Sequence, residues 1–181
     1  LSAEKDRIYV FYRNPYRYPS VSWTDDCGAS WSKRVQYVHS PSKTFAYAQV
    51  ASDGKSRIHI LWTDSHPRKD KLPNFYNKNV NYMYYEDKGS GGVFCRADGT
   101  RIRSLADVVA GKPILPGEAD VVFTSCGDHR SWIWDIVPDE KDRPVVALVD
   151  ISADPDEQHD YYYATFDSSW NTHHIVNGGT R

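Results

Sequence analysis

A short charged motif recurs three times in this chain, and its spacing limits the possible folds more than any other feature. The tripeptide Lys-[Asp/Ser]-Arg stands at residues 5–7, 55–57 and 141–143. Each copy follows an acidic or turn-forming residue and leads into an apolar run rich in β-branched and aromatic residues: 8–12, 58–62 and 144–149. Runs of this kind, opened by a turn, predict β-strands. We therefore expect a chain built from repeated strand units.

The segments that follow each copy predict the same further strands. A second strand is expected at 20–23, 80–85 and 161–164, and then a short aromatic segment that begins near Trp31, Phe94 and Trp170. Repeats of about 45–50 residues made of meandering strands are typical of β-propeller blades, and the 3.6-residue apolar spacing of helical repeats is missing. The sequence predicts an all-β fold, a partial β-propeller of about three four-stranded antiparallel blades.

We expect one propeller segment across residues 1–181, with blades at approximately 1–45, 46–103 and 120–181. The motif copies lie 50 and 86 residues apart. The longer second interval predicts an inserted excursion at approximately 104–119. A closed propeller typically has about four to eight blades, and three blades leave two open sheet edges. We therefore expect the chain to be cut from a larger propeller or to self-associate.

The excursion contains a recognisable helix signal. Ser104 and Asp107 form a capping pair that predicts a short helix at 105–110, which Gly111 ends. The residues at 119–124 then read as a strand, which we assign to the start of the third blade.

Composition excludes several other classes of protein. The chain has 22 Lys+Arg and 24 Asp+Glu, a formal charge of −2, so it shows no electrostatic footprint for nucleic acid or an anionic membrane. No apolar run approaches the roughly 18 residues of a membrane span. The chain has three cysteines, Cys27, Cys95 and Cys126. A disulfide scaffold needs a larger and even number. The first residue is Leu and no signal-peptide pattern follows, so we expect a processed product or a piece of a longer protein.

Residues 24–31 match the pattern [Ser/Thr]-x-Asp-x-Gly-x-[Ser/Thr]-Trp, known as the Asp box. The aspartate is expected to accept backbone amides in a hairpin turn while glycine takes a positive φ and tryptophan packs beneath. A shortened copy stands at 165–170. Because Asp boxes lie at blade turns in many unrelated propellers, this motif predicts the fold and not an activity.

The second repeat carries a more specific pattern, which resembles the BNR-4 repeat family. Residues 52–68, 82–87 and 94–100 contain Asp-Gly, Arg-Ile-His, Thr-Asp-x-His-Pro-Arg, Tyr-Tyr and Arg-Ala-Asp-Gly in that order. Cys95 departs from the tyrosine of the family pattern. The resemblance implies a seven-bladed propeller related to ulvan lyases and to lyases or rhamnosidases that act on rhamnose–glucuronate polysaccharides. It also implies a secreted or periplasmic protein whose partner is a uronate-containing polysaccharide.

Such lyases cleave beside a uronic acid by β-elimination, which requires a cation for the carboxylate, a base for the C5 proton and an acid for the leaving oxygen. The resemblance points to Arg13 as the cation, although Asn14 departs from the family's glycine. Tyr47 and His66 are the other expected catalytic residues. Tyr12 and Arg68 are expected to bind substrate, the latter because it lies in a loop after a strand. The family's catalytic histidines lie in earlier blades, so this chain is not expected to hold all of them.

Ulvan lyases of this architecture carry a structural zinc, and zinc prefers four nitrogen or sulfur ligands in a tetrahedron. The best quartet in this sequence is His66, Cys95, Cys126 and His129. The alternative is two small buried cysteines and polar loop histidines. The acidic loop at 154–157 could bind calcium, but a solvated loop is the favoured interpretation. No nucleotide-binding or other organic-cofactor motif occurs.

Three functions stay open at this point. The leading hypothesis is a polysaccharide lyase. The second is a non-catalytic propeller that binds glycans through aromatic rims or serves as a scaffold, and the third is a glycoside hydrolase of the same fold. Because propellers host many functions, the sequence leaves open whether the chain is an enzyme at all.

Overall fold

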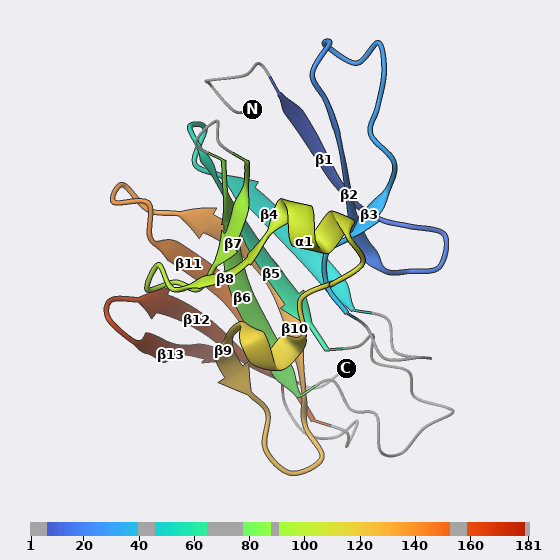
Figure 1. The fold of residues 1–181 in the computed structure, drawn as a ribbon. Coiled ribbons are helices and arrows are strands. Elements are labelled where there is room, and N and C mark those ends of the chain that lie inside the picture. The colour runs from blue at the N-terminus through green and yellow to red at the C-terminus, as the bar shows by residue number, and fades with distance from the viewer. Residues whose placement is uncertain (1–6, 40–45, 65–77, 88–90, 153–158, 180–181) are drawn as a thin grey trace.

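The computed structural model describes residues 7–39, 46–64, 78–87, 91–152 and 159–179. These residues form three antiparallel β-sheets that stand side by side, and the only helical elements among them are one α-helix and one 3-10 turn (Figure 1). The predicted all-β class and the succession of three blades are confirmed. Within this described part, no helix has the length and hydropathy needed to cross a membrane.

The first sheet contains three strands in the order β1-β2-β3. They are β1 (Ile8–Arg13), β2 (Pro19–Thr24) and the short β3 (Val35–Gln36). Four strands were predicted for this blade. Since the charged motif stands at the start of β1, as it does at the start of the second strand in the other two sheets, the described part of this blade lacks the innermost strand.

The second sheet is the largest and lies between the other two. Its inner strands are β4 (Tyr47–Ser52), β5 (Arg57–Thr63) and β6 (Asn79–Glu86). Two segments share the position beyond β6: β7 (Val93–Cys95) pairs with its C-terminal half and β9 (Asp120–Thr124) with its N-terminal half.

The excursion between these two segments follows the predicted outline. β8 (Arg101–Ser104) pairs with β7, and α1 (Leu105–Val109) begins directly after it. The Ser104 side chain accepts a hydrogen bond from the Asp107 amide, as the capping prediction required. A 3-10 turn, η1 (Pro116–Glu118), leads into β9. The assignment of β9 to the third blade was wrong, because it pairs with β6 and completes the second sheet.

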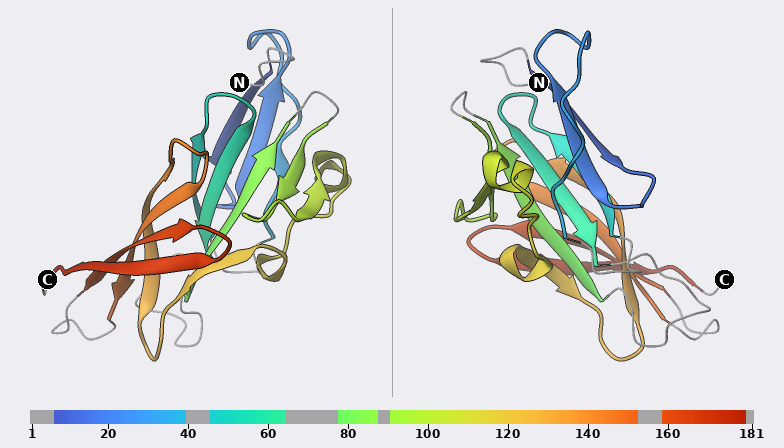
Figure 2. Two further views of the ribbon diagram at one scale, coloured as in Figure 1. Left: turned by 90° about the vertical axis from the view of Figure 1, so that its left-hand side faces the viewer. Right: turned by 45° about the vertical axis from the view of Figure 1, so that its right-hand side comes forward.

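The third sheet is a regular four-stranded blade in the order β10-β11-β12-β13. Its strands are β10 (Arg130–Pro138), β11 (Pro144–Ile151), β12 (Asp160–Phe166) and β13 (Trp170–Asn177). The innermost strands of the second and third sheets are neighbours, because the Gln49 side-chain amide donates to the Trp134 carbonyl at 2.7 Å. The sheets splay outward from this inner edge (Figure 2).

Two apolar cores hold the three sheets together, and β5 supplies both. Ile60 and Trp62 point into the core shared with the first sheet, whereas Leu61 points into the core shared with the third. All three side chains are fully buried. Because alternate residues of a strand face opposite sides, a continuous apolar run is what a sheet covered on both faces requires. Each of these side chains contributes roughly 1.5–3 kcal/mol by its burial.

The repeated motif has a common structural role. In every sheet its arginine stands opposite an acidic residue at the end of the next strand and forms an ion pair with it. The pairs are Arg7–Asp25, Arg57–Glu86 and Arg143–Asp167, at 2.5, 2.9 and 3.6 Å.

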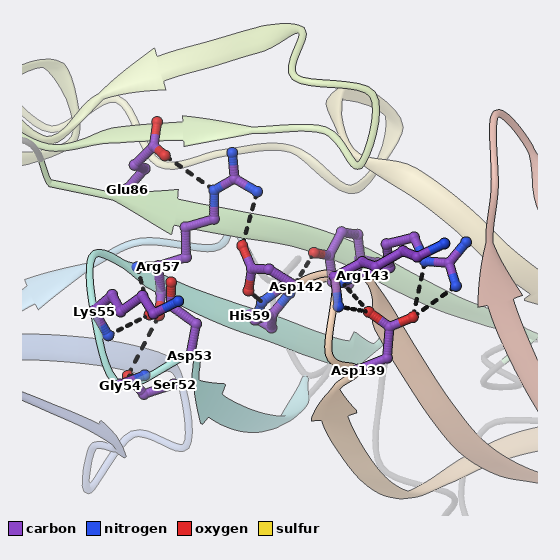
Figure 3. A network of polar contacts seen from close by, with 12 residues as sticks. Ser52, Asp53, Gly54, Lys55, Arg57, His59, Glu86, Asp139, Asp142 and Arg143 are labelled. Carbon is purple, nitrogen blue, oxygen red and sulfur yellow. Dashed lines mark hydrogen bonds and ion pairs between the residues drawn. The ribbon is translucent and has the colours of Figure 1, made fainter.

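Two of these arginines also reach the following sheet. Arg7 lies 3.9 Å from Asp87 of the second sheet, and Arg57 lies 2.8 Å from Asp142 of the third (Figure 3). Asp142 also bonds the buried imidazole of His59 at 2.9 Å. The charged motif therefore fastens each of the first two blades to the next one.

The hairpin turns at this end of the molecule are built by aspartates. Asp53 accepts the amides of Lys55 and Arg57, and Asp139 accepts those of Lys141 and Arg143, at 2.7–2.9 Å (Figure 3). In the Asp box, Asp26 accepts the Ser30 amide and hydroxyl at 2.8 and 2.5 Å, and Gly28 takes a φ of 96°. We call this end the turn face and the opposite end, where β1 and β5 finish and β4 and β10 begin, the site face.

Candidate functional site

Three of the predicted site residues come together on the site face. Tyr12 and Arg13 end β1, Tyr47 begins β4, and all three line one pocket of about 240 Å³ between the first and second sheets. Most of the remaining lining is apolar: Phe11, Pro19, Tyr37, Ala46, Ala48 and Val50. The pocket is therefore a largely apolar hollow with one guanidinium at its edge.

The Arg13 guanidinium is stacked and not ion-paired. Its Cζ atom lies 5.6 Å from the centre of the Tyr47 ring, within the range of a cation–π contact. Across the residues that the structure describes, Arg13 has no acidic partner, and its side chain is exposed. A positive charge that no described acidic residue neutralises is available for an anionic ligand.

The turn after Arg13 explains the departure from the family pattern. Asn14 is buried, and its side-chain oxygen accepts the amides of Tyr16 and Tyr18 at 2.8 and 3.2 Å. Its amide nitrogen donates to the Ser20 hydroxyl at 3.0 Å. The asparagine thus organises the β1–β2 turn through its side chain and fixes the strand end from which Arg13 projects.

An aromatic pair extends the site toward the third sheet. The rings of Tyr47 and Trp132 have centres 4.7 Å apart, although they come from the inner strands of different blades. Trp132 was not among the predicted site residues. Nothing in the local sequence marks it, because its contact with Tyr47 depends on how neighbouring blades are placed.

An acidic residue with a perturbed pKa lies at the same end. Asp64 directly follows β5, and burial raises the pKa of its carboxyl above the usual value. The Asn81 side-chain amide donates to it at 2.8 Å. A carboxyl with a raised pKa holds its proton more readily, which suits a general acid. Its position in the Thr-Asp-x-His-Pro-Arg run was the available signal, but the sequence analysis did not select it.

A histidine–carboxylate pair begins the third blade. His129 Nδ1 lies 3.0 Å from Asp150, which also accepts a hydrogen bond from the Ser125 hydroxyl. The hydroxyls of Ser125 and Ser131 are 2.9 Å apart. A carboxylate that holds one ring nitrogen orients the imidazole, an arrangement found behind metal-binding and proton-transferring histidines alike.

Two members of the predicted zinc quartet, Cys95 and Cys126, lie far apart. Cys95 lies opposite Tyr84, near the end of β6. Cys126 lies near the start of the same strand, because the amide of the preceding Ser125 donates to the carbonyl of Lys78, just before β6 begins. Six residues of strand separate these positions by about 20 Å, while ligands of one zinc ion lie about 4 Å apart. Cys126 and His129 do share one turn, since the His129 amide donates to the Cys126 carbonyl at 3.0 Å.

Other members of the predicted sites lie outside the described residues. These are His66, which was expected in both the catalytic and the metal site, Arg68, and the acidic loop at 154–157. Over the ranges that are described, no three His, Cys, Asp or Glu side chains form a group that could hold a metal ion.

The turn face also has a hollow, of about 230 Å³, but its charges serve the structure. Arg57, His59 and Asp142 line it, and Asp142 bonds to both of the others. His59 is 1% exposed and its Nδ1 lies 2.7 Å from the Tyr82 hydroxyl. His59 is therefore a buried, hydrogen-bonded histidine, and the site face is the better candidate for function.

Comparison with known proteins agrees with this architecture. The chain is similar to the solved structure of an ulvan lyase, a polysaccharide lyase bound to -[GlcA(1-4)Rha3S]-, with a TM-score of 0.68 and 13% sequence identity. The match covers 99% of this chain and 42% of the lyase chain, so this chain spans less than half of that protein's length. At this level of identity the likeness concerns the fold. No curated protein matches the sequence.

The family comparison is more direct. The model of the BNR repeat-containing family matches residues 1–178, which is nearly the whole chain and includes both the Asp box and the pocket residues. The predicted resemblance is confirmed, and the chain belongs to the BNR repeat-containing family.

Proposed function

We propose that this chain supplies part of the substrate site of a polysaccharide lyase that cleaves uronate-containing polysaccharide by β-elimination. One observation carries the proposal: an exposed guanidinium without an acidic partner in the described structure, stacked on a tyrosine at the edge of a 240 Å³ pocket. The similarity of the fold to an ulvan lyase supports the choice of polysaccharide.

The chemistry of β-elimination assigns separate roles to Arg13 and Tyr47. Arg13 would bind the uronate carboxylate and neutralise its charge, which makes the neighbouring C5–H bond acidic enough to break. A base then removes the C5 proton, the electron pair forms the C4–C5 double bond, and the C4–O bond breaks. The Tyr47 hydroxyl would exchange a proton with C5 or with the leaving oxygen. His66 is the other candidate for this exchange, and it lies outside the described residues.

The same function implies where the protein works. Polysaccharides of this kind are too large to enter a cell intact, so a lyase that depolymerises them acts outside the cytoplasm. We therefore infer a secreted or periplasmic protein. Tyr12, which shares the pocket and whose hydroxyl lies 3.1 Å from that of Ser22, is assigned to substrate binding.

The decisive experiment follows the absorbance of the unsaturated uronate at its ultraviolet maximum. The intact protein is incubated with ulvan and other polyuronates, and Arg13→Ala is compared with Arg34→Ala. Arg34 is a matched control, because it is also exposed and stacked on a tyrosine, Tyr16, at 5.6 Å, but lies outside the pocket. We expect Arg13→Ala to lower the rate about 100-fold or more and Arg34→Ala to leave it unchanged.

The Tyr47→Phe variant tests the second role. It keeps the ring on which Arg13 and Trp132 pack and removes only the hydroxyl. A proton-transfer role predicts a fall in kcat of about 10²–10⁴-fold with little change in KM. An unchanged kcat would contradict that role. If the wild type binds polyuronates but releases no product, the protein is a glycan-binding propeller.

Asp64 favours a second candidate, glycoside hydrolysis, because a carboxyl with a raised pKa suits the general acid of that reaction. A hydrolase releases reducing sugar without creating a double bond, so the absorbance stays flat while reducing ends accumulate. In that case Asp64→Asn should abolish the release. The isosteric amide can still accept the hydrogen bond from Asn81, so folding is preserved.

A further inference from the structure

One arginine on the site face is buried without a polar side-chain partner in the described part of the chain. Arg130 is the first residue of β10 and is 8% exposed. No hydrogen bond or ion pair of its side chain occurs within the described structure, and its Nε atom is buried without a partner. Burying a guanidinium nitrogen without a hydrogen-bond partner is costly. An arginine held in this way is poised for a ligand that the protein does not itself provide.

The strand geometry places Arg130 beside the site. It stands two residues before Trp132 in a regular part of β10, so the two side chains leave the strand on the same side, about 7 Å apart. The Trp132 ring packs on Tyr47, and Tyr47 carries the Arg13 guanidinium. Two cations therefore lie near an aromatic pair that bridges the second and third sheets.

We propose that Arg130 binds a second anionic substituent, a carboxylate or a sulfate ester, on a polysaccharide whose uronate is held at Arg13. The rings of Tyr47 and Trp132 form the floor between the two anions, because broad aromatic faces pack well on the apolar faces of sugar rings. This inference rests on the proposed function for the identity of the ligand. It adds a subsite and a preference for densely charged chains.

The test measures binding, so that it does not depend on catalysis. Affinity of the intact protein for a sulfated glucuronate-containing polysaccharide is measured by calorimetry for wild type, Arg130→Met and Arg101→Met. Methionine removes the charge and keeps much of the length. Arg101 is an exposed arginine on β8, away from the site face, and controls for overall charge. We expect Arg130→Met to weaken binding about tenfold or more and Arg101→Met to have little effect.

Modified polymers identify the anion. If desulfation removes the difference between wild type and Arg130→Met, the ligand is a sulfate ester. If reduction of the carboxyl groups removes the difference, the ligand is a carboxylate. A difference that survives both treatments overturns the proposal, as does equal binding of wild type and Arg130→Met to the unmodified polymer.

Stability separates this role from a structural one. Since the residues that the structure describes give the Arg130 side chain no partner, Arg130→Met should melt at the same temperature as wild type or higher. A melting temperature lowered by several degrees would overturn the proposal. If neither wild type nor any variant shows lyase activity, but wild type still binds the polymer more tightly than Arg130→Met, the proposed function is refuted and the proposed subsite is supported.

Discussion

Asp142 offers the sharpest test of how the blades are joined. Its two carboxylate oxygens bond Arg57 at 2.8 Å and His59 at 2.9 Å, both from the neighbouring sheet (Figure 3). The backbone at Asp142 has a φ of 59°, a conformation that asparagine tolerates well and alanine does not. Asp142→Asn is therefore the substitution that removes the charge without adding backbone strain.

The expected loss can be worked out from these contacts. An asparagine has one acceptor oxygen and no charge, so it cannot accept hydrogen bonds from both Arg57 and the 1% exposed His59. A hydrogen bond to a charged group contributes about 1.5–3 kcal/mol, and the partial exposure of Arg57 places this one near the lower end. We expect a loss of about 2 kcal/mol, or a melting temperature lowered by about 4–8 °C for a domain of this size.

The assay is thermal unfolding of the intact protein, with Asp167→Asn as the control. Asp167 lies on the same face, 3.6 Å from Arg143, but its side chain is 82% exposed, so its loss should not be measurable. A double-mutant cycle with Arg57→Gln should return a clear coupling energy. If Asp142→Asn and Asp167→Asn have the same melting temperature, or if the coupling energy is near zero, the contacts of Asp142 with the second blade do not stabilise the fold.

Two further predictions concern a close contact and the Asp box. A Cβ atom at Gly92 would lie 1.7 Å from the hydroxyl oxygen of the buried Tyr85, so Gly92→Ala should destabilise the fold by about 1–3 kcal/mol in urea unfolding. Gly117→Ala is the control and should be neutral, because a Cβ atom there would have nothing within 4 Å. Equal unfolding midpoints of the two variants would contradict this prediction. Hydrogen bonds from Ser30 and Thr24 lower the pKa of Asp26 from 3.8 to about 2. Because the folded pKa lies below the unfolded one, the stabilisation is present above pH 4 and is lost as the pH falls toward 2. Unfolding midpoints of Asp26→Asn should therefore vary less with pH across that window than those of wild type, and an unchanged slope would be evidence against it.

The strands were predictable because their determinants are local. Turn residues, β-branched residues and aromatic residues mark β1, β5 and β11 directly in the sequence. The role of the repeated arginine was not predictable, since its partners lie at the ends of other strands. β9 was assigned to the wrong blade for the same reason, because a strand signal does not specify the strand with which it pairs.

The candidate site shows the same division. Arg13 and Tyr47 could be predicted because a family pattern marks their positions, and both stand at strand ends that meet on one face. Trp132 and Arg130 lie on the inner strand of the next blade, at positions that no local pattern distinguishes. Their importance follows only from two facts of packing: the ring of Trp132 reaches Tyr47, and the side chain of Arg130 finds no partner in the described structure. A candidate binding surface shared between blades depends on contacts between repeats. The residues that the neighbouring blade contributes can therefore be identified only from the three-dimensional arrangement of the repeats.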